Sequence, residues 1–385
     1  MYTYKCLNPI AQVGLDHFSG NYQKVSEDQP SQIILVRSAK MHDMELDKEL
    51  VCVARAGAGV NNIPLDRCAE QGIVVFNTPG ANANGVKELF LFAAIAGVRD
   101  ILGGIRWAEG EFGNPEIAAL AEKSKKQFVG HEIMGKTLGV IGLGAIGVKV
   151  ANAAVSLGMK VIGYDPYLSE AARASLDSLV QVTDSLDEIA ARSQLITIHV
   201  PAMAGTIGMI NADFLSKCRT GVIFINLARD TLVNEPDMQA ALSLGQVGKY
   251  ICDFPTPGAA AMKNAIIIPH LGASTEESED NCAVMAVQQI VDFMENGNIR
   301  NSVNYPPVDF GRADGAVRLC VAHRSSVKTN EIANLLTKAG AVLKGMTGKE
   351  KGDYAYSMFD LTTCPEGIED TVCVDGILKV RIIHS

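Results

Sequence analysis

The chain alternates short apolar runs with longer amphipathic stretches through most of its length. Apolar runs of strand length that alternate with helical patterns are typical of parallel sheets with helical crossovers. The pattern therefore predicts an α/β protein with doubly wound parallel sheets. The runs that we expect to be strands lie at 33–39, 49–57, 72–80, 137–144, 160–166, 195–201, 221–228 and 265–272.

Two helical stretches interrupt this alternation. Residues 86–130 contain a long helical pattern that ends in polar residues, which indicates a connection between two α/β halves. A second helix is expected over 277–297. The segment 301–312 that follows is rich in Pro and Asn and is typical of a linker, so we expect a domain boundary near 310–314.

The last part of the chain, 315–385, has a different order of elements. An apolar strand is followed by a helix, two strands, a short helix and a final strand. This βαββαβ order predicts a small ferredoxin-like unit. The strands are expected at 315–324, 341–349, 353–363 and 377–385, and the helices at 328–340 and 365–373.

A glycine-rich turn joins the apolar run at 137–141 to a helical pattern. Gly142, Gly144 and Gly147 form a G-x-G-x-x-G sequence, and Asp165 ends the next strand. In such turns the glycines permit a tight bend, the approach of a pyrophosphate and close packing of helix on strand. The helix N-terminus favours the pyrophosphate anion, and a carboxylate at Asp165 would bind ribose hydroxyls and repel a 2′-phosphate. The motif predicts NAD as the cofactor; the alternatives are a turn without a ligand and, for Asp165, an Asp-Pro turn.

Three polar residues follow predicted strands, at the edge where an open parallel sheet binds ligands. They are Arg229, which follows 221–228, Asp253, which follows a further apolar run at 249–252, and His270, which follows the apolar residues 265–269. An arginine can hold a carboxylate and polarise the adjacent C–O bond, while an imidazole takes the hydroxyl proton as hydride leaves. Together these residues predict oxidation of a 2-hydroxy acid. Taken singly, they could instead be a surface ion pair of Arg229 with Asp230, a helix cap at Asp253 and a buried histidine.

Composition narrows the function further. With 385 residues and about 150 residues per domain, the chain has room for two full domains and a smaller one. The 34 basic and 43 acidic residues give a net charge of −9, which argues against a surface that binds nucleic acid or anionic lipid. A hydrophobic fraction of 48% is that of an ordinary globular protein.

The cysteines and the apolar runs bear on location. Nine cysteines without a C-x-x-C spacing predict reduced, mostly buried thiols and no metal site. The longest apolar run, 89–98, is too short to span a bilayer, and the N-terminus lacks the apolar core of a signal peptide. We therefore expect a cytoplasmic protein that does not bind membranes.

Several segments are similar to the D-isomer-specific 2-hydroxyacid dehydrogenase family. The resemblance implies two Rossmann-like or flavodoxin-like domains. A discontinuous substrate-binding domain would comprise 1–90 and 273–310, and an NAD-binding domain would comprise 91–272. The last part, 315–385, resembles an ACT domain, a small regulatory module. The family segments are 35–43, 54–89, 130–147, 199–211, 224–230 and 268–281.

The resemblance also implies roles for single residues. His270 would be the general acid and base, and Arg229 would hold and polarise the substrate. Backbone N–H groups of the loop Ala56, Gly57 and Ala58 would bind the substrate carboxylate, and Arg37 with Lys40 would face a phosphate. Read without the resemblance, Arg37 and Lys40 mark a solvated strand end. Besides the three glycines and Asp165, the implied cofactor contacts are Ala145, Ile146, Pro166, His199, Pro201, Thr206, Leu227, Ala228, Asp253 and Gly272.

One departure from the family pattern concerns His270. The family usually pairs its histidine with a glutamate, but Pro257 or Gly258 stands where that residue is expected. Loss of an orienting carboxylate typically lowers the rate without abolishing binding. Either Glu276 or Glu277 replaces it, or His270 works without a carboxylate.

The implied activity is oxidation of 3-phosphoglycerate to 3-phosphohydroxypyruvate with NAD, in L-serine biosynthesis. The alternatives are a dehydrogenase for an unphosphorylated acid, such as glycerate, glyoxylate or lactate, and a non-enzymatic NAD sensor. We expect a homodimer or homotetramer. The ACT-like module would bind an amino-acid effector or serve only as a dimerisation surface. The second alternative arises because Ser325 and Glu331 depart from the usual Asn and Gly of the module's first loop.

Overall fold

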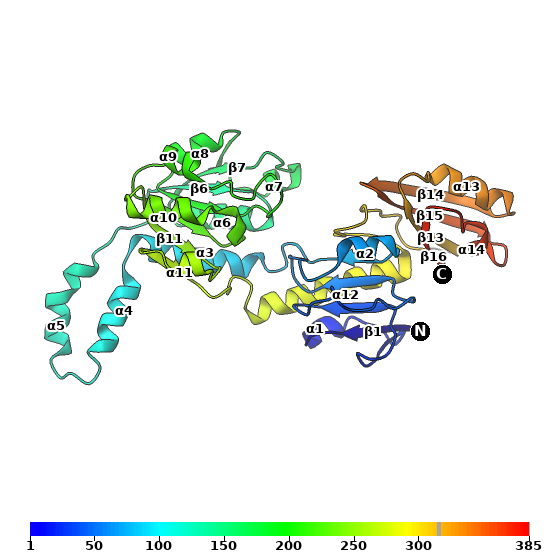
Figure 1. Ribbon diagram of the computed structural model, residues 1–385, viewed down its shortest axis with the longest axis horizontal. Coiled ribbons are helices and arrows are strands. Elements are labelled where there is room, and N and C mark those ends of the chain that lie inside the picture. Colours follow the sequence, from blue (N-terminus) through cyan, green and yellow to red (C-terminus); the bar gives the residue numbers. More distant parts are fainter. Residues whose placement is uncertain (314–316, 385) are drawn as a thin grey trace. The chain divides into compact units, whose positions relative to one another are not determined.

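The computed structural model describes residues 1–313 and 317–384 (Figure 1). Part of the boundary predicted near 310–314, the start of the strand predicted at 315–324 and Ser385 lie outside the described residues. The chain forms two compact units, 1–82 with 276–385 and 83–275. The divisions predicted at 90/91 and 272/273 lie eight and three residues from the boundaries at 82/83 and 275/276. Helix α3, Ala83–Val98, runs unbroken across position 90, so the division falls before it.

The first unit contains a five-stranded parallel sheet in the order β2-β1-β3-β4-β5. The order is that of a flavodoxin-like sheet, as the sequence predicted. Helix α12, Glu276–Asn296, packs against it, and the ring of Phe293 lies edge-on 5.4 Å from Phe76 in their shared core. The strands are Tyr2–Cys6, Tyr22–Lys24, Ile33–Val36, Cys52–Arg55 and Val74–Phe76, and the other helices are α1, Gln12–Leu15, and α2, Leu65–Glu70.

The second unit is built on a seven-stranded parallel sheet in the order β12-β11-β10-β9-β6-β7-β8, with an apolar core on each face. This Rossmann-like order confirms the predicted fold class. Its strands are Thr137–Ile141, Lys160–Tyr164, Gln181–Thr183, Leu195–Ile198, Val222–Asn226, Val247–Cys252 and Ala265–Ile267. The helices α6 to α11 are Ala145–Ser156, Glu170–Ala174, Leu186–Arg192, Ala212–Lys217, Glu235–Ser243 and Pro257–Ala260, and a 3₁₀ turn, η2, covers Asp230–Leu232.

A helical arm extends from the second unit after α3. It consists of α4, Ile101–Gly110, α5, Ile117–Ser124, and the 3₁₀ turn η1, Lys125–Phe128. The arm stands apart from the sheet of its own unit, and none of its three helical segments has a buried residue (Figure 1). The helical stretch predicted over 86–130 is therefore divided into separate helices.

The C-terminal module has the predicted βαββαβ order and an antiparallel sheet in the order β14-β15-β13-β16. This is the ferredoxin-like arrangement. Helices α13 and α14 cover one face of the sheet, and residues of the other face share a core with α12. The strands are Val317–Arg324, Val342–Lys351, Tyr354–Thr363 and Ile377–His384, and the helices are Thr329–Lys338 and Ile368–Thr371.

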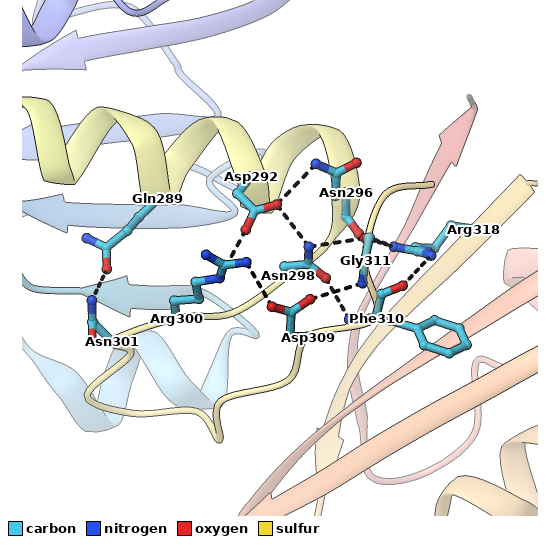
Figure 2. A network of polar contacts seen from close by, with 10 residues as sticks. All are labelled: Gln289, Asp292, Asn296, Asn298, Arg300, Asn301, Asp309, Phe310, Gly311 and Arg318. Atoms are coloured by element: carbon cyan, nitrogen blue, oxygen red, sulfur yellow. Dashed lines mark hydrogen bonds and ion pairs between the residues drawn. The ribbon is translucent and has the colours of Figure 1, made fainter. Parts of the chain in front are cut away.

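A polar network fixes the module to the end of α12 (Figure 2). Arg318 has only 1% of its side chain exposed and pairs with Asp360, with an Nε to Oδ1 distance of 2.6 Å. Its Nη1 donates to the carbonyl oxygens of Asn296 and Gly311 at 2.7 and 2.8 Å. An open groove of about 810 Å³ runs beside this network, along α12 and the linker. Within the described residues, no helix is both long and apolar enough to cross a membrane.

Candidate active site

The glycine turn between β6 and α6 has the shape that the sequence predicted. Gly142 has a φ of +93°, and a Cβ there would lie 2.8 Å from backbone atoms of His199. A Cβ on Gly147 would overlap the carbonyl oxygen of Gly142, so only glycine allows the helix to approach the strand this closely. A Cβ on Gly144 would meet nothing, because this glycine faces open space. Each glycine thus serves a separate purpose.

The first turn of α6 is open at its N-terminus. Gly144 is the N-cap, no side chain caps the helix, Ala145 is exposed and Ile146 is half-buried. The uncapped N–H groups and the helix dipole favour an anion at this point. Asp165, at the end of β7, accepts hydrogen bonds of 2.9 Å from the backbone N–H groups of Leu143 and Tyr167. A carboxylate has about four acceptor positions, so Asp165 retains capacity for ribose hydroxyls.

His199 lies beside this turn. Its Nε2 is 3.0 Å from Thr197 Oγ1, and burial lowers the pKa of its imidazole to about 3, so the ring is neutral at pH 7. Its Nδ1 is buried without a partner among the described residues. A buried polar atom without a partner is rare in a native structure and is consistent with a ligand contact.

A short loop follows His199. The hydroxyl of Thr206 donates to the carbonyl oxygen of Pro201 at 2.6 Å and accepts from the N–H of Met203 at 3.0 Å. The predicted cofactor residues at 201 and 206 thus belong to one closed loop. With the open Gly144, the uncapped helix and the unpartnered nitrogen of His199, these residues fit a dinucleotide.

Asn226, buried at the end of β10, fixes the loop that carries Arg229. Its amide donates to the carbonyl oxygen of Arg229 at 2.8 Å and accepts from the N–H of Ala228 at 3.1 Å. Leu227 between them is buried. The side chain of Arg229 is exposed, and its Nη1 donates to the carbonyl oxygen of Ala228 at 2.6 Å. In the described part of the chain, Arg229 makes no ion pair with Asp230, so the surface ion pair considered above is not observed.

Asp253 and His270 are connected through the backbone. Asp253 is 1% exposed, and its two carboxylate oxygens accept hydrogen bonds of 2.7 Å from the N–H groups of Leu271 and Gly272. Burial raises the pKa of this carboxyl, although the two backbone hydrogen bonds oppose that rise. His270 has a φ of +58°, its side chain is exposed, and its ring centroid lies 5.2 Å from that of Phe254. Asp253 therefore caps the turn that carries His270, instead of a helix.

The position of the absent glutamate is occupied by the first turn of α11. Thr256 caps this helix through the N–H of Ala259 at 3.0 Å, and the Thr256 hydroxyl donates to the carboxylate of Glu235. A Cβ on Gly258 would overlap that carboxylate, so glycine leaves room for Glu235 there. Within the described residues of its own unit, no hydrogen bond joins the ring of His270 to another side chain. Glu276 and Glu277 belong to the other unit.

The residues predicted to bind the substrate belong to the first unit. Arg37 follows β3, and its Nη2 makes an ion pair with Glu279. Lys40 is exposed and has no ion pair among the described residues. In the following loop, the N–H of Ala56 donates to the carbonyl oxygen of Val36, and that of Gly57 to the carbonyl oxygen of Arg55. Of the predicted N–H donors, only that of Ala58 lacks an acceptor within the described residues.

One cationic residue beside Arg37 was not predicted from the sequence. Arg55 ends β4 and pairs in register with Val36 on β3, so it lies next to Arg37. Its Nε donates to the carbonyl oxygen of Arg37 at 3.0 Å. The signal was present, because both arginines end neighbouring parallel strands and meet at one edge of the sheet.

Comparison with known proteins shows which family the chain resembles. A family profile described as D-isomer specific 2-hydroxyacid dehydrogenase, NAD binding domain, matches residues 95–272. The D-3-phosphoglycerate dehydrogenase of Archaeoglobus fulgidus is 34% identical over 291 residues, which are 72% of this chain and 52% of that protein. The human D-3-phosphoglycerate dehydrogenase is 35% identical over 292 residues, 73% of this chain and 52% of that protein.

A solved structure shows the same fold over the same region. The 3-phosphoglycerate dehydrogenase of Entamoeba histolytica with bound NAD⁺ is 26% identical and superimposes with a TM-score of 0.62. The match covers 79% of this chain and 98% of that one. The chain spans about half the length of the curated relatives that it matches.

Proposed function

Because the chain belongs to the D-isomer-specific 2-hydroxyacid dehydrogenase family, we propose that it is an NAD-dependent dehydrogenase that oxidises 3-phosphoglycerate to 3-phosphohydroxypyruvate. The observation that carries the proposal is that each unit carries a different part of the candidate functional side chains. One presents exposed Arg229 and His270 at the same edge of its parallel sheet as the dinucleotide turn, and the other gathers Arg37 and Arg55 at the ends of neighbouring strands. This step would belong to L-serine biosynthesis.

The chain's own residues account for binding and proton transfer. Bound at Gly142 to Gly147, Asp165 and the loop from His199 to Thr206, NAD would supply the hydride acceptor. His270 would take the proton of the substrate hydroxyl at a ring nitrogen as the C–H bond breaks, and would return it in the reverse direction. Arg229 would hold the carboxylate and polarise the C–O bond, with its loop fixed by Asn226.

Two guanidinium groups support a phosphorylated substrate. Phosphate monoesters carry a charge of about −1.5 to −2 at pH 7 and three acceptor oxygens, which suit arginine. Arg37 and Arg55 at one sheet edge, with the exposed Lys40 after β3, would neutralise that charge. An unphosphorylated acid would offer these cations no phosphate, which makes it the second candidate. For a non-enzymatic NAD sensor, the exposed His270 and Arg229 would have no purpose.

Absorbance of NADH tests the activity directly. The protein with NAD and 3-phosphoglycerate should produce NADH, and His270→Ala should abolish this production while NAD still binds. Arg37→Ala should raise the Michaelis constant for 3-phosphoglycerate and leave that for D-glycerate unchanged. No turnover above the His270→Ala control would favour the sensor, and an unchanged Michaelis constant in Arg37→Ala would contradict the phosphate assignment.

The helical arm supports assembly with a second copy of the chain. Helices of 10 and 8 residues are marginal in water unless an apolar face is packed. Ile101 and Ile105, one turn apart on α4, are 40% and 48% exposed. A symmetric pair of copies would cover these residues with identical surfaces. Ile101→Asp with Ile105→Asp should dissociate the oligomer in sedimentation, whereas Leu244→Asp, at an isolated exposed leucine, should not.

The C-terminal module has weaker support as an effector site. Both ring nitrogens of His323 are engaged, Nδ1 at 2.9 Å from the carbonyl oxygen of Arg324 and Nε2 at 2.8 Å from Ser357 Oγ. Glu331 accepts from the N–H of Lys328 at 3.0 Å, and Lys328 Nζ donates to the carbonyl oxygen of Ser325. The loop is thus closed on itself, which favours a structural module over an amino-acid site. Titration with L-serine in a calorimeter would decide between the two roles, because heat of binding would support an effector site.

A cytoplasmic location is consistent with nine free thiols.

A further inference from the structure

Glu279 forms an ion pair with Arg37, the cation that we assign to the substrate phosphate. It lies in the first turn of α12 and its Oε1 contacts Nη2 of Arg37. The two side chains are 41% and 39% exposed, so the pair is accessible to solvent and is not a buried structural bridge. Residues 37 and 279 are 242 positions apart, and the fold of the first unit brings them together.

The pair belongs to a cluster of side chains that also contains Arg55. Arg55 donates to the carbonyl oxygen of Arg37, which places its guanidinium beside the pair. The same three groups act on Cys282, one turn further along α12. Its pKa is raised by burial, lowered by Arg55 and Arg37, and raised by Glu279. Glu279 thus lies in one cluster with both arginines.

The small cavity beside the ion pair does not have room for a phosphate. The cavity bordered by Arg37, Ala56 and Glu279 measures about 20 Å³. This is the volume of about one water molecule. An anion that binds Arg37 through the nitrogen now facing Glu279 must therefore displace the carboxylate.

We propose that Glu279 is an internal competitor for Arg37, which a dianionic phosphate displaces and which thereby lowers the affinity of this place for phosphate anions. The inference rests on the proposed function. A phosphate monoester offers more charge and more acceptor oxygens than one carboxylate, so it replaces Glu279 on Arg37. The uncharged hydroxymethyl end of an unphosphorylated acid cannot do so, and weak anions of the solution are also kept off.

Replacement of the carboxylate by an amide tests this role. Glu279→Gln keeps the shape and removes the competition, so the Michaelis constant for 3-phosphoglycerate should fall about fivefold, since an exposed ion pair contributes roughly 1 kcal/mol at most. The turnover number should stay the same. Inorganic phosphate should become a stronger competitive inhibitor by a similar factor, whereas the Michaelis constant for D-glycerate should not change.

Asp280→Asn is the matched control, because it removes the next carboxylate of α12, which is exposed. It should leave all these constants unchanged. In an Arg37→Ala background, Glu279→Gln should have no effect on the Michaelis constant. An unchanged constant in Glu279→Gln, or an equal fall in Asp280→Asn, would overturn the competitor role while wild-type turnover still upholds the proposed function. Absence of wild-type turnover with 3-phosphoglycerate would instead overturn the proposed function itself.

Discussion

The carboxylate of Asp253 holds the backbone of Gly272, whose N–H donates to Oδ2 at 2.7 Å. Its other oxygen accepts from Leu271, so both residues that follow His270 are fixed by one buried side chain. The φ of His270 is +58°, a conformation that costs about 1–3 kcal/mol for a residue other than glycine. The two hydrogen bonds offset this strain, and the position of the His270 ring depends on them.

Asp253→Asn should therefore disturb both stability and turnover. An amide has one acceptor oxygen, so one buried N–H loses its partner at a cost of about 1–3 kcal/mol. We expect the free energy of unfolding in urea to fall by that amount and the turnover number to fall with it, because the turn that carries His270 relaxes.

A matched control for this variant is Asp184→Asn, at an exposed aspartate of the same unit. It should change neither quantity. Equal unfolding free energies in the two variants would show that Asp253 does not hold the turn.

The fold was predictable where apolar runs determine strands. β3, β6 and β10 all lie inside predicted runs, because buried parallel strands need apolar side chains on both faces. The division of 86–130 into separate helices was not predicted. Asp100 caps α4 through the N–H of Gly103 at 3.2 Å, and Gly113 takes a φ of +84° after that helix ends. Such local backbone signals are weaker than hydrophobic periodicity.

The candidate site was predictable only in part. Arg229 and His270 were predicted because ligands bind beyond the carboxyl ends of parallel strands, and the structure places both residues after such strands. The pairing of Arg37 with Glu279 could not be predicted, because the two residues are 242 positions apart and neither a motif nor a periodicity relates them. The role of Asp253 in holding Leu271 and Gly272 likewise depends on a turn that the side-chain pattern does not reveal.

Substitutions of Gly144 and Gly147 should separate cofactor binding from folding. Gly144 faces open space and has an extended backbone, so Gly144→Ala should fold normally. Its Cβ would obstruct the pyrophosphate, and NADH affinity, measured by fluorescence titration, should fall about tenfold, which is about 1.4 kcal/mol.

In Gly147→Ala the Cβ would overlap the carbonyl oxygen of Gly142, so overpacking should cost about 1–3 kcal/mol of unfolding free energy. If both variants lost only stability, the dinucleotide assignment of the turn would fail.

His199 should make the second unit sensitive to acid. Its pKa is about 3 in the folded protein because the ring is buried, whereas that of an unfolded chain is about 6.5. Above pH 6.5 both states are neutral. Below it only the unfolded state takes the proton, so stability is lost as the pH falls from about 6.5 towards 3, by up to about 1.4 kcal/mol per pH unit.

The free energy of unfolding in urea should be measured for His199→Asn and for the wild type at pH 7.5, 6 and 5, in the absence of NAD. The variant should lose less stability over this range. His131→Asn, at an exposed histidine of the same unit, should follow the wild type. Parallel curves for all three proteins would contradict the buried, neutral state of His199.

Two arginines of the polar network should differ sharply in their contribution to stability (Figure 2). Arg318 is buried and bonded to Asp360 and to carbonyl groups that include that of Asn296, so Arg318→Ala should cost about 3–5 kcal/mol, because it leaves Asp360 and these carbonyls without their donor. Arg300 is 61% exposed and pairs with Asp292 and Asp309 at 3.5 and 2.8 Å. Arg300→Ala should therefore cost less than about 1 kcal/mol.

Thermal unfolding with limited proteolysis would measure this difference. In Arg318→Ala the junction of α12 and the C-terminal module should become cleavable before the sheets unfold, because Arg318 joins β13 to the end of α12. In Arg300→Ala the cleavage pattern should match that of the wild type. Equal effects of the two substitutions would mean that the apolar contacts shared by Phe293, Tyr356 and Met358, instead of the buried arginine, hold the module in place.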